Sequence, residues 1–182
     1  NIEEACPFNM APTTSSTVIM VLGDAIAVAL MKMRGFTLTD YARFHPGGQL
    51  GKRLIMTVAD AMLKGDDNPV INISESMKHC ILEISNKQTG VVSVVNNDGN
   101  LLGLVTDYDI RKHLEKEEDI FSMKIEEIMN SKPISIYDDE KAFSALQIMQ
   151  ERDKPITVLP VINRKDVVIG ILRLQDLVKV GL

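Results

Sequence analysis

The sequence predicts an α/β protein in which two β-α-β-β-α repeats are related by a pseudo-twofold axis and follow a segment that ends in a helix and a loop. Three observations support this. Of the 182 residues, 45% are hydrophobic and 25% charged, which is typical of a soluble globular protein. The last two thirds of the chain contain an internal repeat, and residues 1–56 do not share it.

The repeat is visible at a constant offset of 67 positions. The matching pairs are Val58–Met62 with Ile125–Met129, Gly103–Val105 with Gly170–Leu172, and Asp109 with Asp176. Between these pairs an apolar helical stripe matches at an offset of 65. Small insertions therefore lie in the loops around that helix, where changes in length are tolerated.

The first copy gives five elements in order. Val70–Ile73 is a short strand, and Ser74–Lys87 has apolar residues every three to four positions, which predicts a helix with one buried face. Two β-branched strands, Val91–Val95 and Leu101–Val105, flank an Asp-Gly pair, a strong signal for a tight hairpin. Asp107–Lys116 closes the copy as a helix.

The second copy repeats the order with Ile134–Ile136, Asp139–Arg152, Val158–Ile162, Val167–Leu172 and Leu174–Val180. A unit of about 60 residues buries too little surface to be stable alone, so we expect the copies to pack together. The predicted domains are residues 1–56, 57–117 and 124–182.

In the first copy, a strand ending in Gly103-Leu-Val leads into Thr106-Asp-Tyr-Asp109 at the start of a helix. This arrangement resembles tandem cystathionine β-synthase (CBS) domains, which form a Bateman module. The resemblance implies that Asp109 accepts hydrogen bonds from ribose hydroxyls and that Thr106 contacts the phosphate side of a ligand, in a cleft between the copies. The same spacing is that of a capping box, so a purely structural role stays open.

The second copy has Arg173 in place of the threonine and keeps the acid as Asp176. Arginine cannot cap a helix as a hydroxyl does, although its fork can hold a phosphate, so two unequal clefts are expected.

Ser74 and Glu127 are further candidates for the cleft. The alternatives are that Ser74 caps a helix over Glu75–Lys87 and that Glu127 is solvated. The resemblance implies an adenine nucleotide as ligand, or the activated sugar CMP-Kdo as a feedback signal.

Residues 1–56 contain an apolar run, Val18–Leu30, which is interrupted by Asp24. A membrane span needs about 20 apolar residues, so we expect a buried helix and no membrane anchor. The net charge of −5 argues against nucleic acid as a partner. Cys6 and Cys80 lie far apart without the spacing of metal ligands, so we expect free thiols, no metal and no cofactor.

Four motifs of this segment are Ala11–Ser16, Gly23–Ala25, Arg34–Phe36 and His45–Lys52. They closely resemble the end of the sugar isomerase (SIS) domain in the KpsF/GutQ family of arabinose 5-phosphate isomerases. The resemblance implies a cytoplasmic tetramer that interconverts D-ribulose 5-phosphate and D-arabinose 5-phosphate for the synthesis of Kdo, a sugar acid of lipopolysaccharide or capsule.

His45 is the candidate catalytic residue, because imidazole titrates near neutral pH and can transfer a proton in aldose-ketose isomerisation. The alternative is a loop histidine that caps backbone groups. Since the other catalytic residues of the family lie upstream of these motifs, we expect an inactive regulatory portion of the enzyme. The competing hypothesis is a stand-alone CBS pair that senses nucleotides or dimerises.

Leu114 and Leu177 are expected to be exposed on helix faces and to need cover by another subunit, which predicts at least a dimer.

Overall fold

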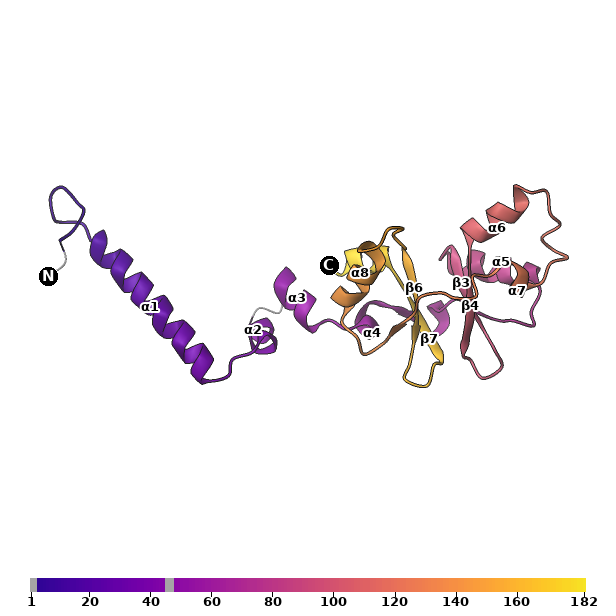
Figure 1. Cartoon of the computed structure of the whole chain (residues 1–182), viewed down its shortest axis with the longest axis horizontal. Helices are drawn as coiled ribbons and strands as arrows, with labels where there is room; N and C mark the ends of the chain where they lie inside the picture. Colours follow the sequence, from indigo (N-terminus) through magenta and orange to yellow (C-terminus); the bar gives the residue numbers. More distant parts are fainter. Residues whose placement is uncertain (1–2, 45–47) are drawn as a thin grey trace. The chain divides into compact units, whose positions relative to one another are not determined.

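The computed structural model describes residues 3–44 and 48–182, and the chain divides into two compact units, Asn1–His45 and Pro46–Leu182 (Figure 1). The first unit contains α1 (Thr14–Met33) and α2 (Leu38–Phe44). Gly35 follows α1 with φ of 60°, a left-handed conformation that ends helices and suits glycine.

The expectation that the apolar run forms a buried helix is wrong for the described chain: no residue of α1 is buried. The physical reason is that the described residues of the first unit form no strand that could cover α1. With 20 residues and an 18-residue stretch of mean hydropathy 1.8, α1 is long and apolar enough to cross a membrane, contrary to the length argument from sequence. Core helices and signal sequences share these properties, so they do not assign α1 to a membrane.

The second unit begins with α3 (Gln49–Ile55) and then contains the two repeats. The first copy consists of α4 (Val58–Ala61), β1 (Leu63–Lys64), a 3-10 turn (Gly65–Asp67), β2 (Val70–Asn72), α5 (Met77–Lys87), β3 (Val91–Val95), β4 (Leu101–Thr106) and α6 (Asp107–Leu114). The second consists of α7 (Ile125–Ile128), β5 (Ile136–Tyr137), α8 (Ala142–Gln150), β6 (Val158–Ile162), β7 (Val168–Arg173) and α9 (Leu174–Lys179). The β-α-β-β-α order of both copies is thereby confirmed.

The two copies have the same sheet. β2 pairs parallel with β3, and β3 pairs antiparallel with β4; β5, β6 and β7 repeat this order and direction. Even the irregularity in the hairpin recurs, at Val94/Val95 and at Val161/Ile162. Asn100 bridges to Val167, its own counterpart in the repeat, so the pseudo-twofold axis passes between these two residues.

Each copy also contributes backbone to the other copy's sheet. β1 of the first copy pairs antiparallel with β7, and Asn130 of the second copy bridges to Leu104 in β4. At these contacts between the two copies, the backbones approach closely. A Cβ at Gly103 would lie 2.4 Å from Sδ of Met129, and a Cβ at Gly170 would lie 2.6 Å from Sδ of Met62. This close approach explains why both copies have glycine at the start of the apolar triplet and methionine after the short helix.

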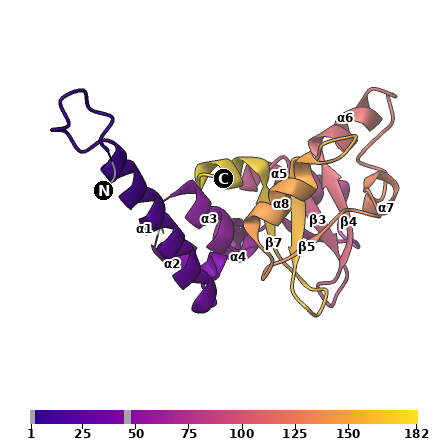
Figure 2. The same cartoon turned by 60° about the vertical axis from the view of Figure 1, so that its left-hand side comes forward.

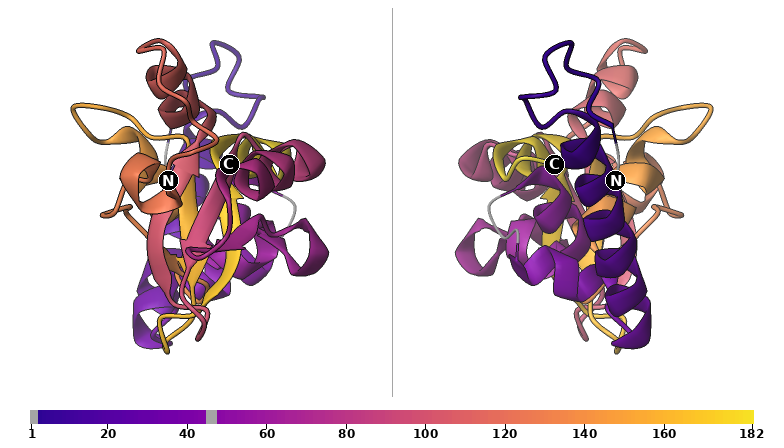
Figure 3. Two further views of the ribbon diagram at one scale, coloured as in Figure 1. Left: turned by 90° about the vertical axis from the view of Figure 1, so that its right-hand side faces the viewer. Right: turned by 90° about the vertical axis from the view of Figure 1, so that its left-hand side faces the viewer.

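Strands of the two copies lie side by side, pink and yellow in the left panel of Figure 3. Val91 and Leu104 of the first copy form one buried cluster with Ile171 of the second. Leu177 lies in the core of the second copy with no exposed surface, so its expected exposure is wrong. The reason is that Leu177 takes the place of Ile110 in the repeat, a core residue of α6, whereas Leu114 is 53% exposed as expected.

The helix α3 (Gln49–Ile55) packs against α8 of the second copy (Figure 2). Lys52 Nζ donates to the carbonyl oxygen of Val180 at 2.8 Å, and the Arg53 guanidinium lies 5.1 Å from the ring centroid of Phe143. These two basic side chains therefore fix α3 to the second repeat.

Candidate ligand-binding clefts

Thr106 and Asp109 meet where β4 runs into α6. Oδ2 of Asp109 accepts from the backbone N–H of Thr106 at 2.9 Å and from its hydroxyl at 2.6 Å. The Asp109 N–H donates to the threonine oxygen at 3.3 Å. This is a complete capping box. Among the described residues, none donates to Oδ1 of Asp109, which leaves that oxygen available to a ligand.

A cavity of about 500 Å³, here called the Asp109 cavity, opens beside this capping box. Its walls come from both copies: the β4–α6 junction, residues 130 and 132–134 before β5, and residues 152 and 154–158, which lead into β6. The cavity has the size of a small-molecule site. Lys132, Arg152 and Lys154 line it together with Asp109.

The matching position in the second copy is closed by an ion pair. Arg173 donates to both carboxylate oxygens of Asp176, from Nε at 2.7 Å and from Nη2 at 2.8 Å. The two side chains are only 12% and 7% exposed, and Lys179 Nζ lies 3.7 Å from Asp176. The arginine fork, which the sequence suggested for a ligand phosphate, is thus bound to the neighbouring acid.

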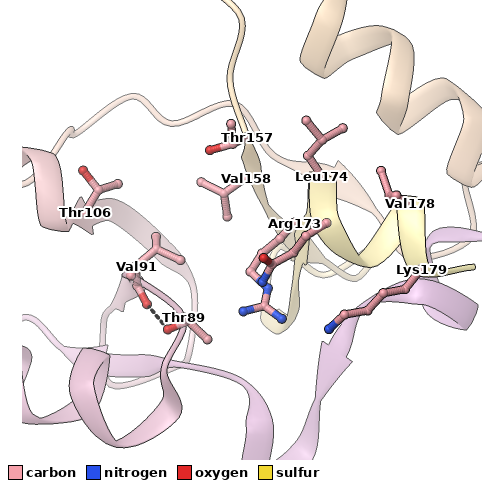
Figure 4. A pocket seen from close by; sticks show the side chains of 11 residues that line it. Thr89, Val91, Thr106, Thr157, Val158, Arg173, Leu174, Val178 and Lys179 are labelled. Atoms are coloured by element: carbon pink, nitrogen blue, oxygen red, sulfur yellow. Dashed lines mark hydrogen bonds between the residues drawn. The ribbon is translucent and has the colours of Figure 1, made fainter.

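A second cavity of about 600 Å³, the central cavity, lies between the copies. Thr89, Val91 and Thr106 form one side, and Thr157, Val158 and one face of α9 form the other (Figure 4). Arg173 extends into it from the end of β7, and the Thr89 hydroxyl donates to the backbone oxygen of Val91 at 2.8 Å. Two cations line this cavity, Arg173 and Lys179, and both lie within ion-pair distance of Asp176, at 2.7 and 3.7 Å.

Ser74 and Glu127 line neither of these cavities. The Ser74 hydroxyl donates to Oδ1 of Asn72 at 2.8 Å in a turn before α5. The alternative that Ser74 caps this helix is wrong, because α5 begins at Met77 and Ser76 is its N-cap, accepting from the N–H of His79 at 3.3 Å. Glu127 accepts from the backbone N–H of Lys124 at 2.7 Å and so caps α7.

Three other expectations from the sequence concern His45, the cysteines and a metal site. His45 lies outside the described residues. Cys80 is buried in the first core, and burial raises the pKa of its thiol to about 11, which keeps the thiol protonated and unreactive. Within residues 3–44 and 48–182, no cluster of three or more His, Cys, Asp or Glu side chains suggests a metal site.

Sequence reasoning missed Lys132, Arg152 and Lys154. They belong to two loop segments that no motif marks, and they come together only because the two copies pair. No sequence signal marks them, because residues 130–134 contain one lysine and residues 151–154 contain two acids beside their two basic residues.

Comparison with known proteins assigns the class. The CBS domain model matches residues 58–116 and 125–182, so the chain belongs to the CBS domain family and contains a tandem pair. Solved CBS pairs have the same fold: CBSX2 in complex with AMP aligns with a TM-score of 0.59 and 23% identity over 69% of this chain and 96% of that one. The CBS pair of MJ0100 in complex with 5'-methylthioadenosine and S-adenosyl-L-methionine aligns with a TM-score of 0.61 and 24% identity over 69% and 95%.

More particularly, the chain is homologous to the CBS-containing part of arabinose 5-phosphate isomerases. It is 41% identical to KdsD of Francisella tularensis over 180 residues, which are 99% of this chain and 54% of that enzyme. It is 38% identical to KdsD of Pseudomonas aeruginosa (98% and 54%) and to KpsF of Escherichia coli (95% and 52%). The chain therefore spans about half the length of the curated relatives it matches.

Proposed function

We propose that this chain is the regulatory part of a cytoplasmic arabinose 5-phosphate isomerase and that it binds an adenine nucleotide in the Asp109 cavity. The parent enzyme interconverts D-ribulose 5-phosphate and D-arabinose 5-phosphate in Kdo synthesis, for lipopolysaccharide or capsule. In this proposal residues 1–56 are the end of a sugar isomerase domain and His45 is one of its catalytic residues. The 41% identity to a relative named as this isomerase supports the assignment.

One observation carries the ligand proposal: a cavity between the copies that contains an acid with one unused oxygen and three cations. The unused oxygen of Asp109 suits ribose hydroxyls, since a carboxylate is a strong acceptor. The cations suit phosphate. AMP is named as the ligand of one solved CBS pair with this fold, which supports adenine as the base. CMP-Kdo also carries a ribose and a phosphate and is the competing ligand.

Calorimetry with AMP and CMP-Kdo, on this chain and on an Asp109→Asn variant, tests the proposal. We expect AMP to bind and the variant to bind it at least about tenfold more weakly, the effect of losing one charge-assisted hydrogen bond. Asp60→Asn is a matched control. Asp60 makes the same contacts to Thr57, at 2.9 and 2.7 Å, but lines neither cavity. Equal binding by the Asp109 variant, or no binding of AMP, would refute the proposal.

A second candidate function is assembly, because apolar side chains are exposed on the helices that close each copy. Tyr108 and Leu114 of α6 are 67% and 53% exposed, and Val178 of α9 is 62% exposed. A homodimer or tetramer would cover them. Light scattering should report at least a dimer at micromolar concentration. A 20.2 kDa species alone would remove this candidate.

A further inference from the structure

The segment that leads into the first copy is attached to the second copy. Besides the two basic side chains of α3 described above, its backbone is held there. Lys141 Nζ donates to the carbonyl oxygen of Ile55 at 3.1 Å. The N–H of Ala142, the first residue of α8, donates to the carbonyl oxygen of Met56 at 3.0 Å. Residues 49–56 are therefore fixed to the second copy, at the start of α8 and at the end of α9.

The end of α9 leaves room for the lysine of α3. The N–H groups of Gly181 and Leu182 donate back to α9 at 3.0 and 3.1 Å, which are the two hydrogen bonds of a Schellman cap. Gly181 has φ of 89°, and a Cβ there would lie 3.0 Å from Nζ of Lys52. The glycine thus permits both the cap and the approach of Lys52, which donates to the carbonyl oxygen of Val180. Such an oxygen at the end of a helix has no donor within the helix.

The first copy holds the equivalent connection in a similar way. At the offset of 67 positions, Val180 corresponds to His113 near the end of α6. The carbonyl oxygen of His113 accepts from the N–H of Glu118 at 3.4 Å, and the His113 ring pairs with the Glu118 carboxylate. Ile120, in the same connection, is buried in the first core. In both copies the end of the closing helix therefore fixes the segment that leads into a short helix, α4 or α7.

The helix α9 connects this attachment to the interior of the second copy. Leu177 has no exposed surface and packs in the second core. Asp176 is 5% exposed and is paired with Arg173 at the start of the helix. A helix held in this way shifts as a unit, because a packed core transmits strain. A rearrangement of the second copy therefore moves the carbonyl group of Val180, and with it Lys52.

We propose that residues 49–56 couple the second copy to the segment that contains His45, with Lys52 as the positioning residue. The first copy follows α3 in sequence, but the contacts above place α3 under the control of the second copy. α3 begins four positions after His45, and four residues span at most about 14 Å, so a shift of α3 reaches His45 through the backbone. The effect on catalysis rests on the proposed function, in which His45 is a catalytic residue.

Hydrogen exchange of this chain, measured by mass spectrometry, tests the attachment. Lys52→Met should speed the exchange of the amides of residues 49–56 about fivefold, the effect of losing one hydrogen bond. Lys52→Arg keeps a cationic donor and should preserve slow exchange. Lys87→Met is the matched control, because Lys87 also donates to a backbone oxygen, that of Asp66 in the first copy. It should leave residues 49–56 unchanged.

A small change inside each copy tests the transmission. Leu177→Val should speed the exchange of residues 49–56 at least about twofold, whereas Ile110→Val, at the equivalent core position of the first copy, should not. Each removes one methylene group, which the fold tolerates. In the Lys52→Met background, Leu177→Val should add nothing, because the connection is already lost.

Three results would each overturn the proposal. They are unchanged exchange of residues 49–56 in Lys52→Met, equal effects of Leu177→Val and Ile110→Val on these residues, and additive effects of Lys52→Met and Leu177→Val.

Activity separates this proposal from the proposed isomerase function. In a full-length enzyme containing this chain, Leu177→Val should lower kcat about two- to fivefold, Ile110→Val should not, and Lys52→Met should abolish this difference. If the exchange results hold but the full-length protein does not isomerise D-arabinose 5-phosphate, the isomerase assignment fails and the coupling stands. If it does isomerise this sugar but kcat responds equally to Leu177→Val and Ile110→Val, the coupling fails and the isomerase assignment stands.

Discussion

At the scale of single residues, the N-termini of four helices are capped in different ways. The helices α4, α6, α7 and α9 each have an acid three positions after the N-cap: Asp60, Asp109, Glu127 and Asp176. In α4 and α6 a threonine completes the capping box, while in α9 the arginine fork replaces it. The sequence spacing predicts these contacts because they are local. It does not reveal which acid faces a cavity, because that depends on the other copy.

The Arg173–Asp176 pair gives a prediction about stability. Arg173→Met should lower the free energy of unfolding by about 3–5 kcal/mol, since it leaves a buried carboxylate without its main partner. Arg173→Met combined with Asp176→Leu should recover most of this loss, because no buried charge remains. Urea denaturation of the three proteins measures both effects.

An exposed pair of similar geometry is the control. Arg164 donates to both oxygens of Asp139, at 3.1 and 2.8 Å, with the side chains 61% and 57% exposed. Arg164→Met should cost less than about 1 kcal/mol, because solvent screens the pair. Equal losses for Arg164→Met and Arg173→Met would show that burial of the second-copy pair has no energetic consequence.

At the scale of elements, the strands and longer helices were predictable because each carries a periodic apolar pattern that occurs twice. The pairing of β1 with β7 and of Asn130 with Leu104, which joins the two copies, was not predictable, since segments of one or two residues have no periodicity. The start of α5 was placed too early because the turn that Asn72 forms with Ser74 resembles a helix start in sequence. Sequence pattern therefore identifies what packs within a copy better than what joins the copies.

The close backbone approach between the copies predicts that alanine at Gly103 or Gly170 lowers the stability of the fold. A Cβ at Gly170 would lie 2.7 Å from the backbone oxygen of Leu63 as well as 2.6 Å from Sδ of Met62. Since the backbone of β1 cannot move without breaking its pairing to β7, Gly170→Ala should destabilise the fold by about 1–3 kcal/mol. Chemical denaturation with urea should show an earlier midpoint for this variant.

Two other glycines calibrate that result. At Gly103 the nearest atoms belong to the flexible Met129 side chain and the closest backbone oxygen is 3.0 Å away, so Gly103→Ala should cost less than Gly170→Ala. At Gly23 in α1 no atom lies within 4 Å, and alanine there should not destabilise the chain. An unchanged midpoint for Gly170→Ala would contradict the account of the close backbone approach.

At the scale of the whole molecule, the overall charge and the charge of the site have opposite signs. The net charge of −5 argued against nucleic acid as a partner but gave no hint of the three cations that line the Asp109 cavity. The cavity draws its cations from residues 132, 152 and 154 and its acid from the first copy, so it exists only in the paired fold. Net charge averages over the whole chain and does not show where basic residues meet. The resemblance to CBS pairs, in contrast, predicted a cleft between the copies.

The last prediction concerns activity. The chain spans 54% of the length of the KdsD enzymes it matches, and the proposed isomerase chemistry needs groups beyond His45. We therefore expect no isomerisation of D-arabinose 5-phosphate by this chain alone in a coupled assay.

In a full-length enzyme containing this chain, His45→Ala should lower kcat by about 10²- to 10⁴-fold, the usual effect of losing an acid-base group. Asp109→Asn should leave the activity without nucleotide unchanged, because Asp109 belongs to the CBS pair. Turnover by the chain alone, or full activity of the His45 variant, would contradict the division between a catalytic part and a sensing part.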